Sequence, residues 1–296
     1  MNAPEEIWKL AQERASARES KDFARADRLR DAIEVAGWEV IDVSGNFELR
    51  RKVRYPTFEN IGQLKSFVPG EIEICIGMIV EDFQADAVTA IRSIRKFSDV
   101  PIVIICFGGV GLLEEETDSR LFLVQISENC GWGAAANALL RSVLSTYVLI
   151  MDPSTRFTGD AITPVLHQLR QGDYAAVGWR GGLVNIEDEW RSVEDKGIGE
   201  VDVLFSYFLA VDRESALEAG GFNSRAIYYR NADIEFSLRL RHANGRLLQM
   251  ELPLEQDRHH GYYDVDPTYR QVQSKKNYDR VLERFRGKNA ILSPRR

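Results

Sequence analysis

Residues 147–154 read YVLIMDPS, and this stretch decides the fold. Five mostly apolar residues with β-branched members predict a buried strand, and Pro153 cannot extend its hydrogen-bonded ladder. In open α/β sheets, a carboxylate such as Asp152 at the carboxyl end of a buried parallel strand lies in the crevice where ligands bind. The alternative is a strand that merely ends in an Asp-Pro turn. The segments around the stretch must decide between the two.

Strand and helix patterns alternate on both sides of this stretch. Short apolar runs predict strands, and helical spacing of apolar residues predicts helices between them. The strands cover residues 72–80, 100–107, 121–126, 147–151 and 203–211, and the helices cover 85–97, 134–144 and 269–285. This βαβ alternation predicts a parallel sheet with helices on both faces.

Composition places the chain among soluble globular proteins with an ample core. The 296 residues are 44% hydrophobic and 28% charged, which suggests one large domain with an appendage. A net charge of -7 argues against a general nucleic-acid-binding surface, and no apolar run approaches the roughly 20 residues of a membrane span. The N-terminus is charged and helical in pattern, unlike a signal peptide, so we expect a cytoplasmic protein. Cys75, Cys106 and Cys130 lack the spacing of metal ligands, so we expect them to be reduced thiols of the core.

The first 54 residues have a pattern of their own. Apolar spacing predicts two helices within residues 5–36, with a break at Ser20-Lys21-Asp22, where Asp22 can cap the second helix. Gly37 ends that helix. Strands at 38–43 and 47–53 flank Ser44-Gly45-Asn46, a hairpin signal. We therefore expect a helical hairpin plus a β-hairpin over residues 1–54.

This N-terminal segment resembles the C-terminal helical region of cysteinyl-tRNA synthetases, from near Arg14 to Arg54. The resemblance is carried by KDFARADRLRD at 21–31, followed by Gly37 and Asp42, and the synthetase catalytic core is absent. In that family the region packs near tRNA. Residues 1–55 hold eleven Lys/Arg and eleven Asp/Glu, however, and phosphate binding needs a positive face. We expect packing or homo-oligomer formation through these helices, with tRNA contact as the alternative.

The remaining boundaries follow from composition. Residues 55–70 contain prolines and glycines without a clean period, so they predict a linker. The alternating α/β pattern then runs over residues 71–287, and residues 288–296 form a C-terminal tail.

Small residues gather where the strand at 121–126 passes into the next helix. The segment 128–137 reads ENCGWGAAAN and contains Asn129, Gly131 and Asn137. The exposed N–H groups at such a helix start suit a phosphate. The alternative is a tight strand–helix turn without a ligand.

Four motifs then occur in one order along the chain. They are the Asn129–Asn137 helix start, the acidic turn at Asp152, the turn GGFN at residues 220–223 and the helical segment ADIEFSLRLR at 232–241. From about residue 71 to 286 the chain thereby resembles the family 2 glycosyltransferases. The resemblance implies the GT-A fold, a Rossmann-like mixed sheet flanked by helices. It also implies inverting transfer of a sugar, of hexosyl type, from a nucleotide-activated donor to an acceptor that the sequence does not specify.

The resemblance also assigns roles to residues. Asp233 is the implied catalytic base, and the helix dipole favours a charged carboxylate in the first turn of its helix. The alternative is that Asp233 only caps the helix. Glu235 can pair with Arg239, four residues on. The donor side is implied at Asn129, Gly131, Asn137, Asp152 and Ser154, and the acceptor side at Gly221 and Phe222. Trp179 and Arg180 can extend the acceptor pocket, because aromatic faces suit sugar rings, or else serve in packing.

Several positions depart from the family pattern. Ser154 stands where a second acid helps hold a divalent cation, Mn²⁺ or Mg²⁺, on the diphosphate, and Ser is a poor ligand for such an ion. The strand at 100–107 ends without the usual base-reading acid, so Glu81 is the donor-side carboxylate that we expect instead, and Ala232 replaces a Glu. Asp152 and His259 are the metal-ligand candidates. His259 is followed by His260, and two adjacent residues in a strand point to opposite faces, so at most one of the two histidines faces the cleft. We therefore expect weak metal dependence.

Three functions remain open at this point. The first is glycosyl transfer. The second is a catalytically degenerate glycosyltransferase-like protein that binds a sugar, a nucleotide or a protein, which the departures at Ser154 and Ala232 favour. The third is an RNA-associated enzyme that its N-terminal segment directs to tRNA, against which the neutral charge of that segment argues.

Overall fold

The computed structural model describes residues 3–43, 46–52, 55–65, 72–116 and 118–295. The chain forms two compact units, Met1–Pro56 and Thr57–Arg296. Each unit has its own buried apolar cluster, so each is described by itself.

The N-terminal unit is a helical hairpin followed by a β-hairpin, which confirms the prediction. It contains α1 (Glu5–Glu19), α2 (Phe23–Val35), β1 (Trp38–Val43) and the antiparallel β2 (Asn46–Arg51). Asp22 caps α2 by accepting a hydrogen bond from the Arg25 N–H. Buried Arg14 donates to Asp42 on β1 at 2.8 Å and so ties α1 to the hairpin. The core consists of Ile7, Ala11, Ile33, Trp38 and Val40. Ser44 and Gly45 of the expected turn, and residues 53 and 54 at the end of the expected N-terminal unit, lie outside the described residues.

The second unit is built on a mixed sheet with the strand order β12-β15-β9-β14-β7-β4-β5-β6-β3. Strands β3 to β7 pair in parallel, whereas β14 runs antiparallel between β7 and β9. The expectation of a purely parallel sheet was therefore wrong, and the mixed sheet implied by the glycosyltransferase resemblance is confirmed. The bounds are β3 (Thr57–Phe58), β4 (Ile72–Val80), β5 (Ile102–Phe107), β6 (Leu121–Ile126), β7 (Ser145–Met151), β9 (Ala176–Gly178), β12 (Gly199–Val201), β14 (Phe208–Asp212) and β15 (Leu247–Gln249).

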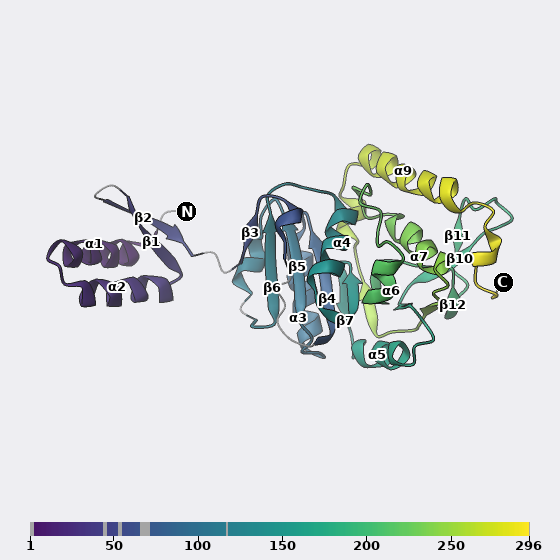
Figure 1. Ribbon diagram of the computed structural model, residues 1–296, viewed down its shortest axis with the longest axis horizontal. Coiled ribbons are helices and arrows are strands. Elements are labelled where there is room, and N and C mark those ends of the chain that lie inside the picture. Colours follow the sequence, from purple (N-terminus) through teal and green to yellow (C-terminus); the bar gives the residue numbers. More distant parts are fainter. Residues whose placement is uncertain (1–2, 44–45, 53–54, 66–71, 117, 296) are drawn as a thin grey trace. The chain divides into compact units, whose positions relative to one another are not determined.

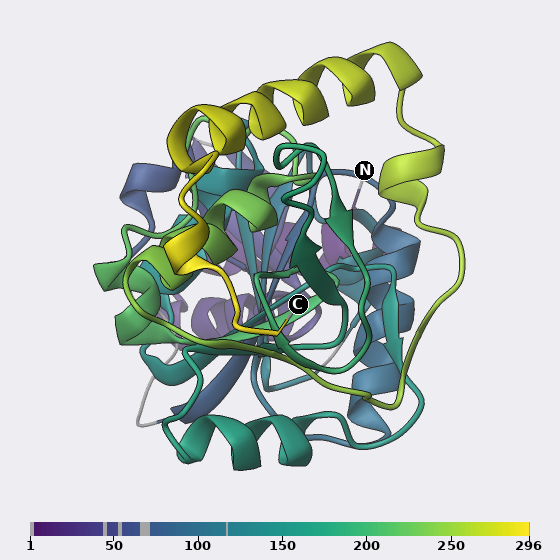
Figure 2. The same cartoon turned by 90° about the vertical axis from the view of Figure 1, so that its right-hand side faces the viewer.

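Helices cover both faces of this sheet because its central strands are apolar on both sides (Figure 1). On one face α4 comes very close: a Cβ on Gly77 would lie 2.9 Å from a methyl carbon of Leu139, so a larger residue would displace that side chain. Helix α9 packs on α7 through an apolar cluster that includes Ile234, Leu238, Val281 and Phe285 (Figure 2). The helices are α3 (Gln84–Arg95), α4 (Trp132–Ser142), α5 (Ile162–Arg170), α6 (Arg213–Glu218), α7 (Ala232–His242), α8 (His260–Tyr263) and α9 (Pro267–Phe285), with 3-10 turns η1 (Ile61–Gln63), η2 (Gly111–Glu115) and η3 (Asn289–Ile291).

Two small sheets complete the unit. One joins β10 (Gly181–Val184) to β11 (Val193–Glu194) and β13 (Val203–Leu204), and the other pairs β8 (Thr155–Phe157) with β16 (Leu254–Gln256). The single strand expected at 203–211 is divided into β13 and β14. The cause lies on α7, where Asp233 accepts hydrogen bonds from the N–H and hydroxyl of Ser206 and so draws the chain out of the ladder.

Part of the expected linker belongs to the sheet. Thr57–Phe58 pairs with β6, and Phe58, Ile61 and Leu64 pack against the core. The Pro/Gly content concealed this, because a two-residue strand shows no period. Residues 66–70 of the expected linker, and residue 71, where the α/β pattern was expected to begin, lie outside the described residues.

Two expectations from composition concern the whole chain. Within the described ranges, none of the helices combines the length and apolar composition that a bilayer crossing requires. Cys75, Cys106 and Cys130 are free thiols, and burial raises the pKa of Cys75 and of Cys106 to about 12.

Candidate active site

A cavity opens where the neighbouring strands β4 and β7 end at their carboxyl edges. Its acidic lining residues come from the turn after β4, from α3 and from the turn after β7. Its aromatic lining residues come from the turn before α3, the start of α4 and the loop before α7. The acids are Glu81, Asp82, Asp86 and Asp152, and the aromatic residues are Phe83, Trp132, Tyr228 and Tyr229. His259, Ser154 and Ser206 are further polar residues of the lining. This is the crevice at which open α/β sheets bind ligands.

Asp152 is held by three hydrogen bonds at the floor of this cavity. Its Oδ1 accepts from the N–H of Ser154 at 2.8 Å and from the Ser154 hydroxyl at 2.5 Å, and its Oδ2 lies 2.9 Å from Nε2 of His259. Burial favours the neutral acid, but the hydrogen bonds from His259 and Ser154 outweigh it and hold the Asp152 pKa below its usual range. Asp152 is therefore a fixed negative charge beneath the cavity.

His259 lies against Asp152 and not in a strand. It immediately precedes α8, is 8% exposed, and its Nδ1 is 3.3 Å from the Tyr229 hydroxyl. His260 is the first residue of α8, with Nδ1 2.5 Å from Asp264 and Nε2 3.8 Å from Asp86, and it stacks on Phe83. The strand assumed for this histidine pair was wrong, because the chain turns helical between them. Of the two, only His259 lines the cavity, in agreement with the expectation that at most one would face it.

The carboxylates near the cavity do not form a metal centre. In the part of the chain that the structure describes, no three His, Cys, Asp or Glu side chains come together as a metal ion would require. Both oxygens of Asp152 already accept hydrogen bonds, and the Ser154 hydroxyl also accepts one from Gln256 at 2.7 Å. These side chains therefore do not present the free oxygen donors that a divalent cation requires.

Asp233 lies one side chain behind the cavity wall. It is 6% exposed, and its Oδ2 accepts from Ser206 N at 2.9 Å and from Ser206 Oγ at 3.1 Å. Asn231 occupies the N-cap position of α7, so Asp233 is not the capping residue. Burial raises the pKa of Asp233 to about 6 although these hydrogen bonds oppose it, so desolvation outweighs the helix dipole, which was expected to favour the charged form. The carboxylate still remains mainly ionised at neutral pH.

The first two N–H groups of α4 are already hydrogen-bonded. The N–H of Trp132 donates to the Ile227 carbonyl at 2.9 Å, and that of Gly133 donates to the Ala226 carbonyl at 2.8 Å. Gly133 is required because a Cβ there would lie 2.1 Å from the Asn223 carbonyl oxygen. A loop from another part of the chain therefore occupies these two N–H groups, which the sequence led us to expect exposed to a phosphate.

Asn129, Gly131 and Glu81 lie together beside the cavity. Asn129 accepts from the Gly131 N–H at 2.8 Å, and its amide lies 3.5 Å from Glu81 Oε1. Burial raises the pKa of Glu81 above its usual range, against the hydrogen bond from Asn129. Of these residues Glu81 reaches the lining, whereas Asn129 and Gly131 shape the loop behind it.

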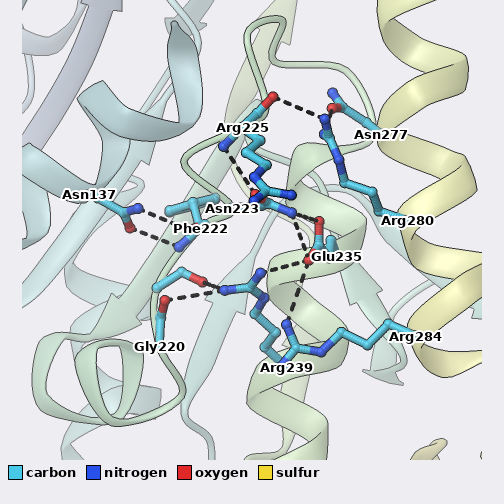
Figure 3. Close-up of polar contacts among 11 residues, drawn as sticks. Asn137, Gly220, Phe222, Asn223, Arg225, Glu235, Arg239, Asn277, Arg280 and Arg284 are labelled. Atoms are coloured by element: carbon cyan, nitrogen blue, oxygen red, sulfur yellow. Dashed lines mark hydrogen bonds and ion pairs between the residues drawn. The ribbon is translucent and has the colours of Figure 1, made fainter. Parts of the chain in front are cut away.

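The cavity lining does not include Asn137, Gly221 or Phe222. Asn137 is instead hydrogen-bonded to the backbone of the 220–223 turn (Figure 3). The Asn137 side chain accepts from Phe222 N and donates to Phe222 O, both at 2.8 Å. Phe222 is 1% exposed and stacks on Phe236 with ring centres 3.9 Å apart. Gly221 has φ +62°, and a Cβ would lie 2.3 Å from Asn137 Oδ1. These contacts hold the 220–223 turn between α4 and α7.

Glu235 fixes the same turn from α7 (Figure 3). It is 2% exposed, accepts from the Asn223 amide at 2.8 and 3.1 Å, and pairs with Arg239 at 2.7 Å. Arg239 in turn donates to the carbonyls of Gly220 and Gly221. The expected Glu235–Arg239 pair is confirmed.

Trp179 and Arg180 also lie outside the cavity lining. Trp179 is buried, and the exposed Arg180 guanidinium stacks 4.4 Å from its ring centre. The sequence missed Asp86, Ser206, Tyr228 and Tyr229, which do line the cavity. Only Asp86, an acid in the first turn of a helix after a strand, carried a local signal.

Comparison with known proteins bears on the fold. No protein-family model and no curated protein matches the chain. The chain is similar to the structure of GalNAc-T7 with UDP, GalNAc and Mn²⁺, at 12% identity and TM-score 0.55 over 72% of this chain and 48% of that one. It is also similar to the mannosyltransferase PcManGT from Pyrobaculum calidifontis in complex with GDP-Man and Mn²⁺, at 16% identity and TM-score 0.55 over 73% and 65%.

A third similarity is to S. aureus TarS residues 1–349, at 11% identity and TM-score 0.50 over 74% of each chain. This chain has the GT-A fold. It spans 48% and 65% of the length of the first two structures, GalNAc-T7 and PcManGT. In this chain the parallel strands β4 and β7 end at the side of the sheet where the cavity opens, and Asp152 follows β7 there.

Proposed function

We propose that this protein transfers a sugar, of hexosyl type, from a nucleotide-activated donor to an acceptor, with inversion, as the resemblance to family 2 glycosyltransferases implies. The observation that carries the proposal is the cavity at the carboxyl ends of β4 and β7, with the buried acid Asp233 directly behind its wall. The similar GT-A structures, which contain UDP or GDP-Man, support the donor class.

On the donor side, the aromatic lining offers ring faces to a nucleobase or a sugar, and Glu81 and Asp86 offer carboxylates to hydroxyl groups. Burial raises the pKa of both acids above the usual range of a carboxyl group. The cavity volume is about 100 Å³, below the roughly 300–1,000 Å³ of pockets that enclose a whole ligand. Part of a nucleotide-sugar donor therefore extends beyond the enclosed part.

On the acceptor side, Asp233 is the base. The acceptor hydroxyl oxygen forms a bond to the anomeric carbon while the bond from that carbon to the diphosphate oxygen breaks. The proton of the acceptor hydroxyl passes to Asp233. Because Ser206 lines the cavity and its hydroxyl already donates to Asp233 Oδ2, we propose that Ser206 relays this proton.

The proposal is tested with a panel of nucleotide sugars, each with and without Mn²⁺. A true donor at one hundred times its Kd should add about 2.7 kcal/mol to the free energy of unfolding, read as a thermal shift. Release of nucleoside diphosphate from the stabilising donor then reports turnover. If no nucleotide sugar shifts the melting temperature, the proposal fails.

A non-catalytic nucleotide- or sugar-binding protein is the second candidate. It is favoured by the state of Asp152, because both of its oxygens already accept hydrogen bonds, from Ser154 and His259, and are not free to hold a cation on a diphosphate. Under this alternative a nucleotide sugar stabilises the protein but is never broken down.

The pH dependence of transfer follows from Asp233. A base must be ionised to accept a proton, and burial raises the Asp233 pKa to about 6. We expect kcat/KM to fall about tenfold per pH unit below about pH 6. A profile of kcat/KM from pH 4.5 to 8 checks this, and an acid limb near pH 4 would mean that the base titrates as an exposed carboxylate.

A further inference from the structure

The acidic lining of the cavity creates an electrostatic problem for a nucleotide donor. Glu81, Asp82, Asp86 and Asp152 all line it, and the whole chain carries a net charge of -7. A diphosphate brings further negative charge, and like charges in a partly desolvated site repel strongly. The following inference rests on the proposed function, since it asks which groups balance that charge.

Two arginines gather on one tyrosine ring beside the cavity. The guanidinium carbon of Arg230 lies 4.4 Å from the centre of the Tyr262 ring, and that of Arg270 lies 4.1 Å from it. Arg270 also donates a hydrogen bond to the Tyr262 carbonyl. Two cations held on one ring repel each other, and an anion that accepts hydrogen bonds from both would offset that repulsion.

Neither member of this arginine pair is neutralised. Among the residues that the structure describes, no Asp or Glu oxygen lies within 4.0 Å of the Arg230 or the Arg270 guanidinium. Two other ring-stacked arginines differ: Arg258, over Tyr263, pairs with Asp264, and Arg246, over Tyr174, pairs with Glu200. The two guanidinium groups therefore have N–H donors that are not hydrogen-bonded to carboxylates of the described residues.

The arginine pair is anchored next to the cavity. Tyr262 follows Gly261, which lines the cavity, and its ring stacks 6.4 Å from that of His259. The Tyr228 hydroxyl donates to the Gly261 carbonyl at 2.8 Å. The 2% exposed Asn277 donates to the carbonyls of Tyr228 and Arg230 at 2.8 and 2.9 Å. The backbone that carries Arg230 is thereby fixed to α9, where Arg270 lies.

We propose that Arg230 and Arg270, assembled on Tyr262, form an anion site that binds the diphosphate of the nucleotide donor. Guanidinium groups bind phosphate oxygens through paired N–H donors, and they remain charged at any working pH. The arginine pair supplies beside the cavity the positive charge that its acidic lining lacks. It also stabilises the diphosphate as it leaves, because negative charge increases there when the bond to the sugar breaks.

The test uses the full chain and inorganic pyrophosphate, by titration calorimetry in buffer containing EDTA. The variants are Arg230→Met/Arg270→Met, Arg230→Lys/Arg270→Lys and, as a matched control, Arg246→Met, which removes a stacked but paired arginine from another cavity. We expect binding to weaken about tenfold per arginine in the Met pair, about tenfold in total in the Lys pair, and not at all in the control. If the Met pair fails to fold, the Lys pair carries the test.

Two results overturn the anion site. One is a wild type that does not bind pyrophosphate, and the other is a folded Met or Lys pair that binds it within about twofold of wild type. UDP and GDP are titrated in parallel to separate the two proposals. A wild type that binds pyrophosphate but no nucleotide contradicts the proposed function alone, whereas UDP or GDP binding that is unaffected in the Met pair contradicts the anion site alone.

Discussion

Asp233→Asn is expected to reduce sugar transfer by about 10²–10⁴-fold, the usual contribution of a general base. The amide cannot accept the proton of the acceptor hydroxyl, although it has nearly the same shape as the carboxylate. The donor should bind with unchanged affinity, because Asp233 lies behind Ser206 and not in the cavity lining. Steady-state rates of nucleoside diphosphate release, with donor affinity from calorimetry, check both parts.

The stability of the same variant separates catalysis from folding. The Asp233 pKa is raised by burial from 3.8 to about 6, so the native state binds this proton more tightly than the unfolded state. The wild type should therefore lose stability as pH rises from about 4 to about 6, and this contribution should vanish in Asp233→Asn. We expect the variant to be at least as stable as wild type at pH 7. An active wild type whose turnover is indifferent to the change would remove Asp233 from the mechanism.

Glu235→Ala is expected to lower the free energy of unfolding by about 3–5 kcal/mol, since it leaves the Arg239 charge buried without its partner. The Arg239 side chain is only 12% exposed, and the Asn223 amide loses both of its hydrogen bonds at the same time. Urea denaturation at pH 7 measures the loss as a lower midpoint at constant slope.

The matched control for this variant is Glu73→Ala. Glu73 also pairs with an arginine, Arg170, at 2.6 Å, but its side chain is 42% exposed. A surface pair contributes about 0–1 kcal/mol, so this change should be nearly silent. Equal losses in the two variants would show that burial of the Glu235 network does not stabilise the 220–223 turn.

Local features of the sequence determined most elements. Buried strands and amphipathic helices leave a periodic pattern within ten to fifteen residues, so the boundaries of β4 and β6 were predicted correctly. The Asp22 cap and the Glu235–Arg239 pair span three and four residues, and both were found. The position of Asp152 at the end of β7 followed in the same way, since a strand and the Pro that stops it are adjacent in the chain.

Only the tertiary structure decided the chemistry of the site, because each deciding contact joins distant segments. The carbonyls of Ala226 and Ile227 accept hydrogen bonds from the first two N–H groups of α4. His259 forms a hydrogen bond with Asp152, and Ser206 forms one with Asp233. None of these partners is marked by spacing. The direction of the Asp233 pKa shift was also hidden, since the helix dipole is local whereas desolvation depends on everything packed around the group. The sequence by itself determined which acids end the strands and begin the helices, and packing alone decided which of them face the cavity and which have their oxygens already bonded.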